Sequence, residues 1–236
     1  MPRYIDFISA YCDRWCERCS FTERCSSFAV TSALAMCDGD HDAAMELAIG
    51  RPRIPGEKPQ KTLQECIGDA AESAGVDFDP SEQELAQIGR EMHERRERVR
   101  RRPAATASQD YAVAARRWLE EHPECEAPED PAVREALDVI RWDLFLVHVK
   151  IMRALDGQDE DPKGRFWKSA TQSDWNGSAK VALLSIERSE SAWRALAASM
   201  PDEAAGVLAA SLADLRQEVT KQFPKAMRFH RPGFDD

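Results

Sequence analysis

The sequence predicts an all-α protein, and three observations carry the prediction. Hydrophobic residues recur at spacings of three and four along most of the chain. Alanine, leucine, glutamate and arginine are abundant, whereas alternating β-branched runs of the kind that mark strands are almost lacking. At 236 residues with 43% hydrophobic side chains, the chain can bury a sizeable core. We expect an N-terminal helical module followed by a C-terminal antiparallel helical bundle.

The first module is expected to cover residues 1–78. Residues 4–17 and 22–36 have the pattern of two short helices that flank a cysteine-rich turn, and a third helix is expected over 40–49. Residues 51–60 contain three prolines and a glycine and predict a loop. Helical periodicity then resumes over 62–74.

The middle region, residues 79–128, is expected to hold an arginine-rich connecting helix and the first helix of the bundle. Ser81 and Glu84 have the spacing of a capping box, so a helix should begin there and run to Arg102, before Pro103. The next amphipathic segment covers 107–122.

The rest of the bundle is expected over 129–236, with helices at 130–156, 174–199 and 202–223. Separators rich in proline and acidic residues lie between these segments. In the 130–156 helix, hydrophobic residues recur on one side and fill much of the other, which predicts a central helix that is buried over most of its surface.

Charge and composition exclude some classes of protein. The formal net charge of −10 argues against a uniformly basic surface for nucleic acid. No segment reaches the roughly 20 apolar residues that cross a bilayer, and the first dozen residues lack the features of a signal peptide. We expect a cytoplasmic protein that does not bind membranes. In that reducing compartment, clustered cysteines act as metal ligands more often than they form disulfides.

Four of the seven cysteines lie within fourteen residues, with the spacing C-x3-C-x2-C-x5-C. Thiolates are soft ligands, and four of them complete either a tetrahedral zinc site or the corners of a cubane iron–sulfur cluster. A short loop that contains all four ligands favours a [4Fe-4S] cluster, with Zn²⁺ as the alternative, because structural zinc sites usually join distant segments. The expected ligands are Cys12, Cys16, Cys19 and Cys25. Arginines at 14, 18 and 24 would offset the negative charge of such a site.

The segment WCERCSFTERC resembles the end of the cluster loop in helix-hairpin-helix DNA glycosylases of the endonuclease III and MutY type. In that family a C-x6-C-x2-C-x5-C run holds a [4Fe-4S] cluster, and the last three ligands match here in spacing. The first gap is three residues rather than six, so the match is weakest at Cys12. The resemblance covers residues 12–25 alone and implies the cluster without the glycosylase activity. WhiB-type regulators end their cluster motif with the same C-x2-C-x5-C spacing.

Cys12, Cys16 and Cys19 also satisfy the C-x3-C-x2-C signature of radical SAM enzymes. Glu17 stands where that family usually has an aromatic residue, and Cys25 offers a fourth ligand. The chain also lacks the alternating strands and helices of that family's barrel. The sequence therefore favours a cluster with four protein ligands.

Other motifs have simpler explanations than a functional site. Asp38, Asp40 and Asp42 alternate as in a calcium loop, but the glycine and glutamate that such a loop needs are missing, so a helix N-cap is the better interpretation. His148 lies in the most apolar helix and is expected to be a core histidine with a hydrogen-bond partner. Glutamates alternate with most arginines of 90–102. Only the basic tail of that helix offers phosphate contacts, from Arg98, Arg100, Arg101 and Arg102.

Taken together, these features predict a soluble [4Fe-4S] protein with a structural or redox-sensing role, whose helical bundle binds a protein partner. Two alternatives stay open: a zinc-binding interaction module without redox chemistry, and an enzyme that uses a pocket inside the bundle. The sequence indicates neither a substrate nor an oligomeric state.

Overall fold

The computed structural model of the chain describes residues 4–50, 69, 72–73, 81–164, 169–200 and 202–236. The described residues form seven α-helices and several short 3₁₀ turns, and they contain no strand. The prediction of an all-α protein is therefore confirmed. Within the same ranges, no helix combines the length and the apolar character that a membrane crossing requires.

The chain divides into two compact units, and each is described by itself. One unit is Ser26–Glu97, and the other combines Met1–Cys25 with Arg98–Asp236. This division differs from the boundaries expected from the sequence, because residues 4–25 pack with the later helices and not with the segment that follows them. All four cysteines of the predicted site thus belong to the larger unit.

In the smaller unit, helices α1 (Ser26–Met36) and α2 (His41–Ile49) pack against each other. Asp40 caps α2, since its carboxylate accepts hydrogen bonds from the backbone N–H groups of Asp42 and Ala43. Helix α4 (Glu82–Arg100) begins at the expected capping box, in which Ser81 and Glu84 bond reciprocally. The expected loop at 51–60 and most of the expected helix at 62–74 lie outside the described residues.

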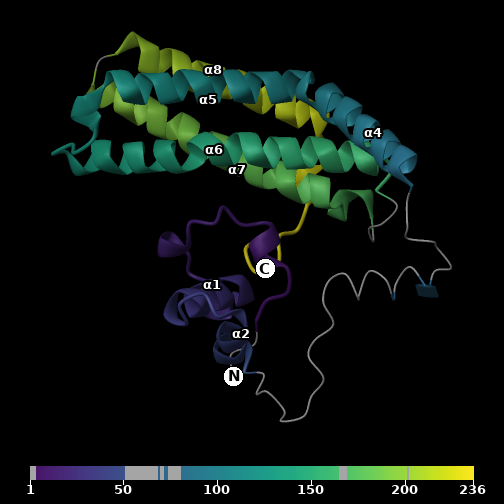
Figure 1. Cartoon of the computed structure of the whole chain (residues 1–236). Helices are drawn as coiled ribbons and strands as arrows, with labels where there is room; N and C mark the ends of the chain where they lie inside the picture. The colour runs from purple at the N-terminus through teal and green to yellow at the C-terminus, as the bar shows by residue number, and fades with distance from the viewer. Residues whose placement is uncertain (1–3, 51–68, 70–71, 74–80, 165–168, 201) are drawn as a thin grey trace. The chain divides into compact units, whose positions relative to one another are not determined.

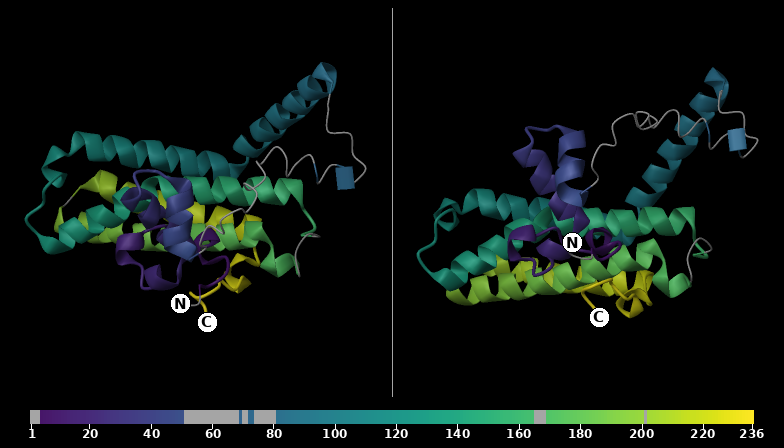
Figure 2. Two further views of the ribbon diagram at one scale, coloured as in Figure 1. Left: turned by 60° about the horizontal axis from the view of Figure 1, so that its bottom comes forward. Right: turned by 90° about the horizontal axis from the view of Figure 1, so that it is seen from below.

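The larger unit is built on four long helices, which lie side by side in the views of Figures 1 and 2. Helix α6 packs against α5 and α7, and α8 packs against α5 and α7, so the four helices surround one core. Their bounds are Pro103–Glu121 for α5, Pro131–Glu160 for α6, Asp174–Ser199 for α7 and Glu203–Gln222 for α8.

Each of these helices starts where the sequence offers a good N-terminus. Pro103 occupies the first turn of α5, and Asp130 caps α6 with Pro131 behind it. The hydroxyl of Ser173 caps α7, and the carboxylate of Asp202 caps α8. The expected bounds of the last three helices agree closely with these starts.

A buried polar network joins α5 to α7 in this core. Tyr111 and Ser189 share a hydrogen bond of 3.0 Å between their hydroxyl oxygens, and the indole N–H of Trp193 donates to the Tyr111 hydroxyl at 3.0 Å. Tyr111 and Trp193 are 2% and 0% exposed. Burial raises the pKa of Tyr111, so its hydroxyl keeps its proton and remains available to the network.

The prediction of a helix at 4–17 is wrong. Ile8–Ala10 and Cys16–Arg18 each form a 3₁₀ turn, and the chain between them is irregular. Phe7 and Arg14 both have a φ of 61°, in the left-handed region that ends a right-handed helix. The helix expected at 22–36 likewise begins only at Ser26.

Replacing Tyr111 with Phe should lower the free energy of unfolding by about 1–3 kcal/mol, because the Trp193 N–H and the Ser189 hydroxyl lose a buried partner. Chemical denaturation monitored by circular dichroism measures this change. Val113→Ala, at an exposed position of the same helix, is the control and should change stability by less than about 0.5 kcal/mol. Equal stability of both variants would contradict the network's role.

Candidate metal centre

The four clustered cysteines lie on one irregular loop that three 3₁₀ turns shape. Cys16 begins the turn Cys16–Arg18 and Cys19 follows it, with a hydrogen bond of 3.1 Å from the Cys19 N–H to the Cys16 carbonyl oxygen. A 3₁₀ turn brings residues three apart onto the same side, which suits a pair of ligands. The Ile5 N–H donates to the Arg24 carbonyl oxygen at 2.9 Å and closes the base of the loop.

Cys12, Cys19 and Cys25 lie within electrostatic range of Cys16. Burial raises the pKa of the Cys16 thiol, and the neighbouring thiols of Cys12, Cys19 and Cys25 raise it further. All four side chains are half-buried, and none of the described cysteines forms a disulfide. The Phe21 N–H points at the Cys19 sulfur at 3.4 Å, a contact that stabilises a thiolate ligand.

These thiols do not converge as tightly as the ligands of a single ion. Among the described residues, no group of three or more His, Cys, Asp or Glu side chains has the arrangement of a metal-ion site. The loop therefore brings four thiols to one region without the tight convergence of a single-ion site.

Aromatic stacking anchors the loop on α6. The rings of Trp15 and Trp142 stack at 5.0 Å between centroids and 12° between planes. The Trp142 indole N–H also donates to the Asp13 carbonyl oxygen at 2.9 Å. On the other side, the Arg18 guanidinium lies 3.9 Å from the Trp15 ring and pairs with Glu135 and Asp138 of α6. Trp15 precedes Cys16 directly, so these contacts fix the start of the ligand turn.

An ion-pair network anchors the same loop on α7. Arg188 binds both carboxylate oxygens of Asp143, at 2.6 and 2.9 Å, and reaches the Asp13 carboxylate at 2.7 Å. Asp143 is fully buried, and burial raises its pKa although Arg188 partly offsets the effect. Arg188 therefore links a buried acid of α6 to the loop residue between the first two cysteines.

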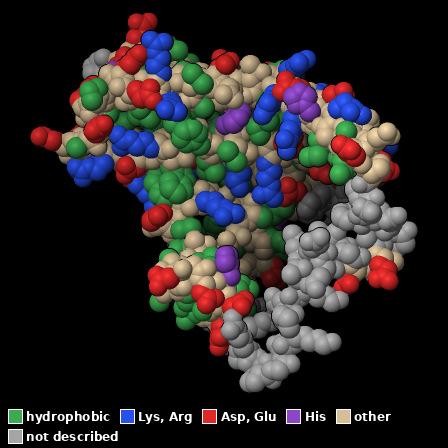
Figure 3. Space-filling view, in the orientation of Figure 1, with side chains coloured by type: hydrophobic (Ala, Val, Ile, Leu, Met, Phe, Trp, Pro, Cys, Tyr) green, Lys and Arg blue, Asp and Glu red, His purple; other side chains and the backbone are tan. Residues whose placement is uncertain are grey.

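Basic side chains surround the loop near Cys12. Lys150 of α6 is only 6% exposed, and its ammonium donates to the Ala10 carbonyl oxygen at 3.3 Å. Burial lowers the pKa of Lys150, while the negative charge of a Cys12 thiolate acts in the opposite direction. Arg153 contacts the same carbonyl oxygen at 3.4 Å. Hydrophobic and basic side chains mingle over this face of the unit (Figure 3).

Sequence analysis missed Lys150 and Arg188, which lie far from the cysteines in the chain. The only signal in the sequence was a charged residue within an otherwise apolar helical stripe. Such a residue does not indicate which group it contacts. Of the three arginines expected beside the cluster, Arg18 is engaged with Trp15, Glu135 and Asp138. Arg14 and Arg24 are exposed, and Arg14 lies close enough to Lys150 to lower its pKa slightly.

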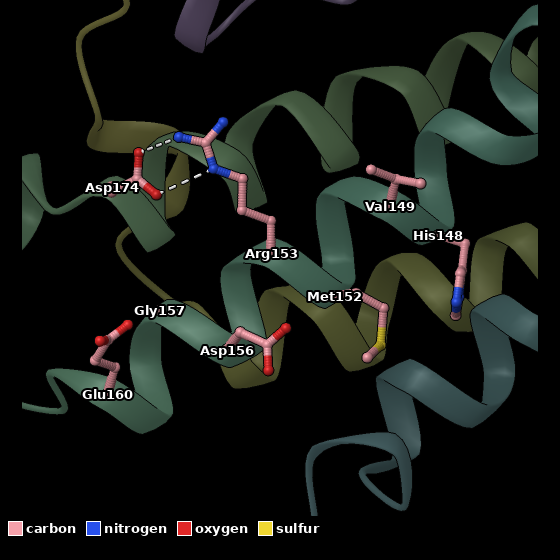
Figure 4. Close-up of a pocket in the computed structure, with 8 residues that line it drawn as sticks. All are labelled: His148, Val149, Met152, Arg153, Asp156, Gly157, Glu160 and Asp174. Atoms are coloured by element: carbon pink, nitrogen blue, oxygen red, sulfur yellow. Dashed lines mark hydrogen bonds and ion pairs between the residues drawn. The ribbon is translucent and has the colours of Figure 1, made fainter. Parts of the chain in front are cut away.

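His148 has the hydrogen-bond partner expected of it. Its Nδ1 lies 2.9 Å from the hydroxyl oxygen of buried Ser108 on α5, and burial lowers the histidine pKa. His148 also lines an open groove of about 550 Å³ along α6. In this groove Arg153 reaches Asp174 at the start of α7, whereas the side chains of His148 and Met152 point to the other side of α6 (Figure 4).

The basic tail of α4 is engaged in part with α6. Arg98 and Arg102 both pair with Asp159, at 3.0 and 2.9 Å. Arg102 also donates to the side-chain oxygen of Gln158 at 3.1 Å. These two arginines therefore hold the junction between α4 and α5 against α6, and Asp159 balances part of their charge.

Replacing Arg188 with Met should lower the free energy of unfolding by about 3–5 kcal/mol, because it leaves the buried Asp143 carboxylate unpaired. Thermal and chemical denaturation measure the change. Arg116→Met removes an exposed i,i+4 pair with Glu120 and serves as the control, with a change of less than about 1 kcal/mol. The double variant Arg188→Met with Asp143→Leu should recover part of the loss. A single variant as stable as the control would contradict this account of the anchor.

No family model, no curated protein and no solved structure matches the chain. The residues of the cysteine loop and their surroundings therefore carry the inference of function.

Proposed function

We propose that the chain binds a [4Fe-4S] cluster through Cys12, Cys16, Cys19 and Cys25 and uses it in a structural or redox-sensing role. The observation that carries the proposal is the shared position on one loop of four thiols that form no disulfide, with Cys12, Cys19 and Cys25 all within electrostatic range of Cys16. Such a loop can wrap a cluster whose ligated irons lie at separate corners. A cluster bound there would supply reversible one-electron chemistry.

The surroundings of the loop fit an anionic group. Four thiolates around a cubane give a net negative charge, and Lys150, Arg14 and Arg153 contribute positive charge beside Cys12. Among the described residues, the buried ammonium of Lys150 has a single hydrogen-bond partner, the Ala10 carbonyl oxygen. A buried cation with so little compensation is stabilised by a nearby anion.

The proposal also includes a helical bundle and a surface for a protein partner. The cysteine loop packs with α5 to α8 in the larger unit, and we propose that these four helices act as the antiparallel bundle that supports it. The exposed side of α6 carries Phe145 and Val149, which are 62% and 57% exposed, and this face is our candidate surface for a protein partner. A reducing compartment such as the cytoplasm keeps these thiols available.

The alternative is a zinc-binding interaction module without redox chemistry. Cys16 and Cys19 on one 3₁₀ turn have the C-x2-C spacing that zinc sites also use, and this observation keeps the alternative in view. Metal analysis of untagged protein purified without oxygen separates the two. About four irons and matching sulfide per chain support the cluster, whereas colourless protein with one zinc per chain supports the alternative.

Cys16→Ser and Cys19→Ser should each abolish most of the metal binding and destabilise the cysteine loop, because metal binding and folding are linked at such sites. Iron and sulfide content, together with visible absorption, provides the measurement. Cys125→Ala is the matched control, since this buried thiol lies at the short turn before α6 and should leave the metal content unchanged. Full metal content in both serine variants would refute the ligand assignment.

Lys150→Met should lower the reduction potential of the cluster by tens of millivolts. Reduction adds a negative charge, which a buried ammonium stabilises, so its removal disfavours the reduced state. A spectroscopic redox titration measures the potential. Lys150→Arg keeps the charge and should stay near the parent value, as should Lys221→Met at an exposed position of α8. If all three variants shared one potential, the electrostatic role of Lys150 would be wrong.

A further inference from the structure

The residues that follow the 3₁₀ turn Ala226–Arg228 fold back over the cysteine loop. We define residues 229–236 as the strap. Its first residue, Phe229, is 3% exposed and packs on Tyr11 with 4.6 Å between ring centroids. Both rings approach α7 at Gly177, where a Cβ atom would lie 2.4 Å from Tyr11 and 2.8 Å from Phe229. The first residue of the strap is therefore tightly packed against Tyr11 and α7.

A buried lysine of α7 holds both ends of the strap. The Lys180 ammonium donates to the Phe229 carbonyl oxygen at 2.7 Å and to the Asp235 carboxylate at 2.6 Å. Arg231 also donates to Asp235 at 2.9 Å. Burial alone would raise the pKa of Asp235, but these donors outweigh it and hold the pKa well below its usual range. The carboxylate is therefore ionised at neutral pH, and the contacts that hold the strap are formed.

The middle of the strap covers the ligand loop. The Phe234 ring meets Phe21 edge-on with 5.0 Å between centroids. Phe234 also lines two cavities of about 240 Å³ beside the loop, one bordered by Cys12 and the other by Cys19. Gly233, with a φ of 80°, lies so close to Ile5 that a Cβ atom would be 2.9 Å from its side chain. One side chain of the strap thus borders the space beside two of the proposed ligands.

We propose that the strap shields Cys12 and Cys19 from molecules dissolved in the solvent, and that in the cluster-bound protein it limits the access of dioxygen to the cluster. The second half of this inference rests on the proposed function, whereas the first half holds for the free thiols. Phe234 acts as the cover, and Lys180 keeps the strap in place through its two hydrogen bonds.

The test of the first half uses metal-free, reduced full-length protein. Iodoacetamide labelling followed by peptide mass spectrometry gives the rate at each cysteine. Phe234→Ala and Lys180→Met should label several-fold faster than the parent at Cys12 and Cys19, with an unchanged rate at Cys37 in the smaller unit. Phe145→Ala, at an exposed phenylalanine of α6, is the matched control and should leave all rates unchanged. Circular dichroism verifies that each variant is folded.

The cluster-bound protein provides the second measurement. After exposure to air, Phe234→Ala should lose its visible absorption several-fold faster than the parent and the Phe145→Ala control. Folded Phe234→Ala and Lys180→Met that label at the parental rate would overturn the shielding role, whatever the metal content. Faster labelling in a protein that binds no cluster would support the shielding of the thiols and would refute the proposed function instead.

Discussion

The ion pair between Arg188 and the buried Asp143 is the constraint on which the geometry of the cysteine loop depends. A carboxylate without access to water needs a paired cation, since an isolated buried charge costs several kcal/mol. Arg188 satisfies Asp143 with two of its nitrogens and uses the third to bind Asp13. The position of the loop is therefore tied to the register between α6 and α7, so a shift in that register would also move the loop.

Local charge around the loop differs from the charge of the whole chain. The net charge is −10, yet Lys150, Arg153 and Arg188 all contact residues 10–13. Arg188 pairs with Asp143 and Asp13, and Arg153 pairs with Asp174. Lys150 has no carboxylate within hydrogen-bond distance among the described residues, and a negative charge on Cys12 acts on it. Net charge, read from composition, could not reveal this local arrangement.

Sequence analysis was most successful where a local signal decides the structure. The helix starts expected near 174 and 202, and the capping box at Ser81, depend only on neighbouring residues, and the structure has N-caps at Ser173 and Asp202. Periodicity also identified the buried apolar stripe of α6, but the expected burial over most of its surface is wrong, since Phe145 and Val149 on its other side are exposed. These features need no knowledge of distant contacts.

Prediction from the sequence failed where tertiary contacts override the local conformational preference of the chain. Residues 4–17 have helical periodicity, but Trp15 packs on Trp142 and Asp13 bonds to Arg188, and these contacts require an irregular backbone with Arg14 in the left-handed region. The strap escaped notice for the same reason, since its bonds to Lys180 join residues about fifty positions apart. The four cysteines were recognisable from spacing, whereas the side chains that surround them were not.

Gly177 marks the place where Tyr11 and Phe229 pack on α7, and this feature does not involve the cysteines. Tyr11 and Phe229 come so close to the backbone of α7 at this point that even alanine would collide with both rings. Any descendant of this chain that retains the packing of both terminal segments must keep glycine there, whether or not it retains the cysteines. A helix interior disfavours glycine by about 1 kcal/mol relative to alanine, so a glycine retained at this position in more distant sequences would mark this packing.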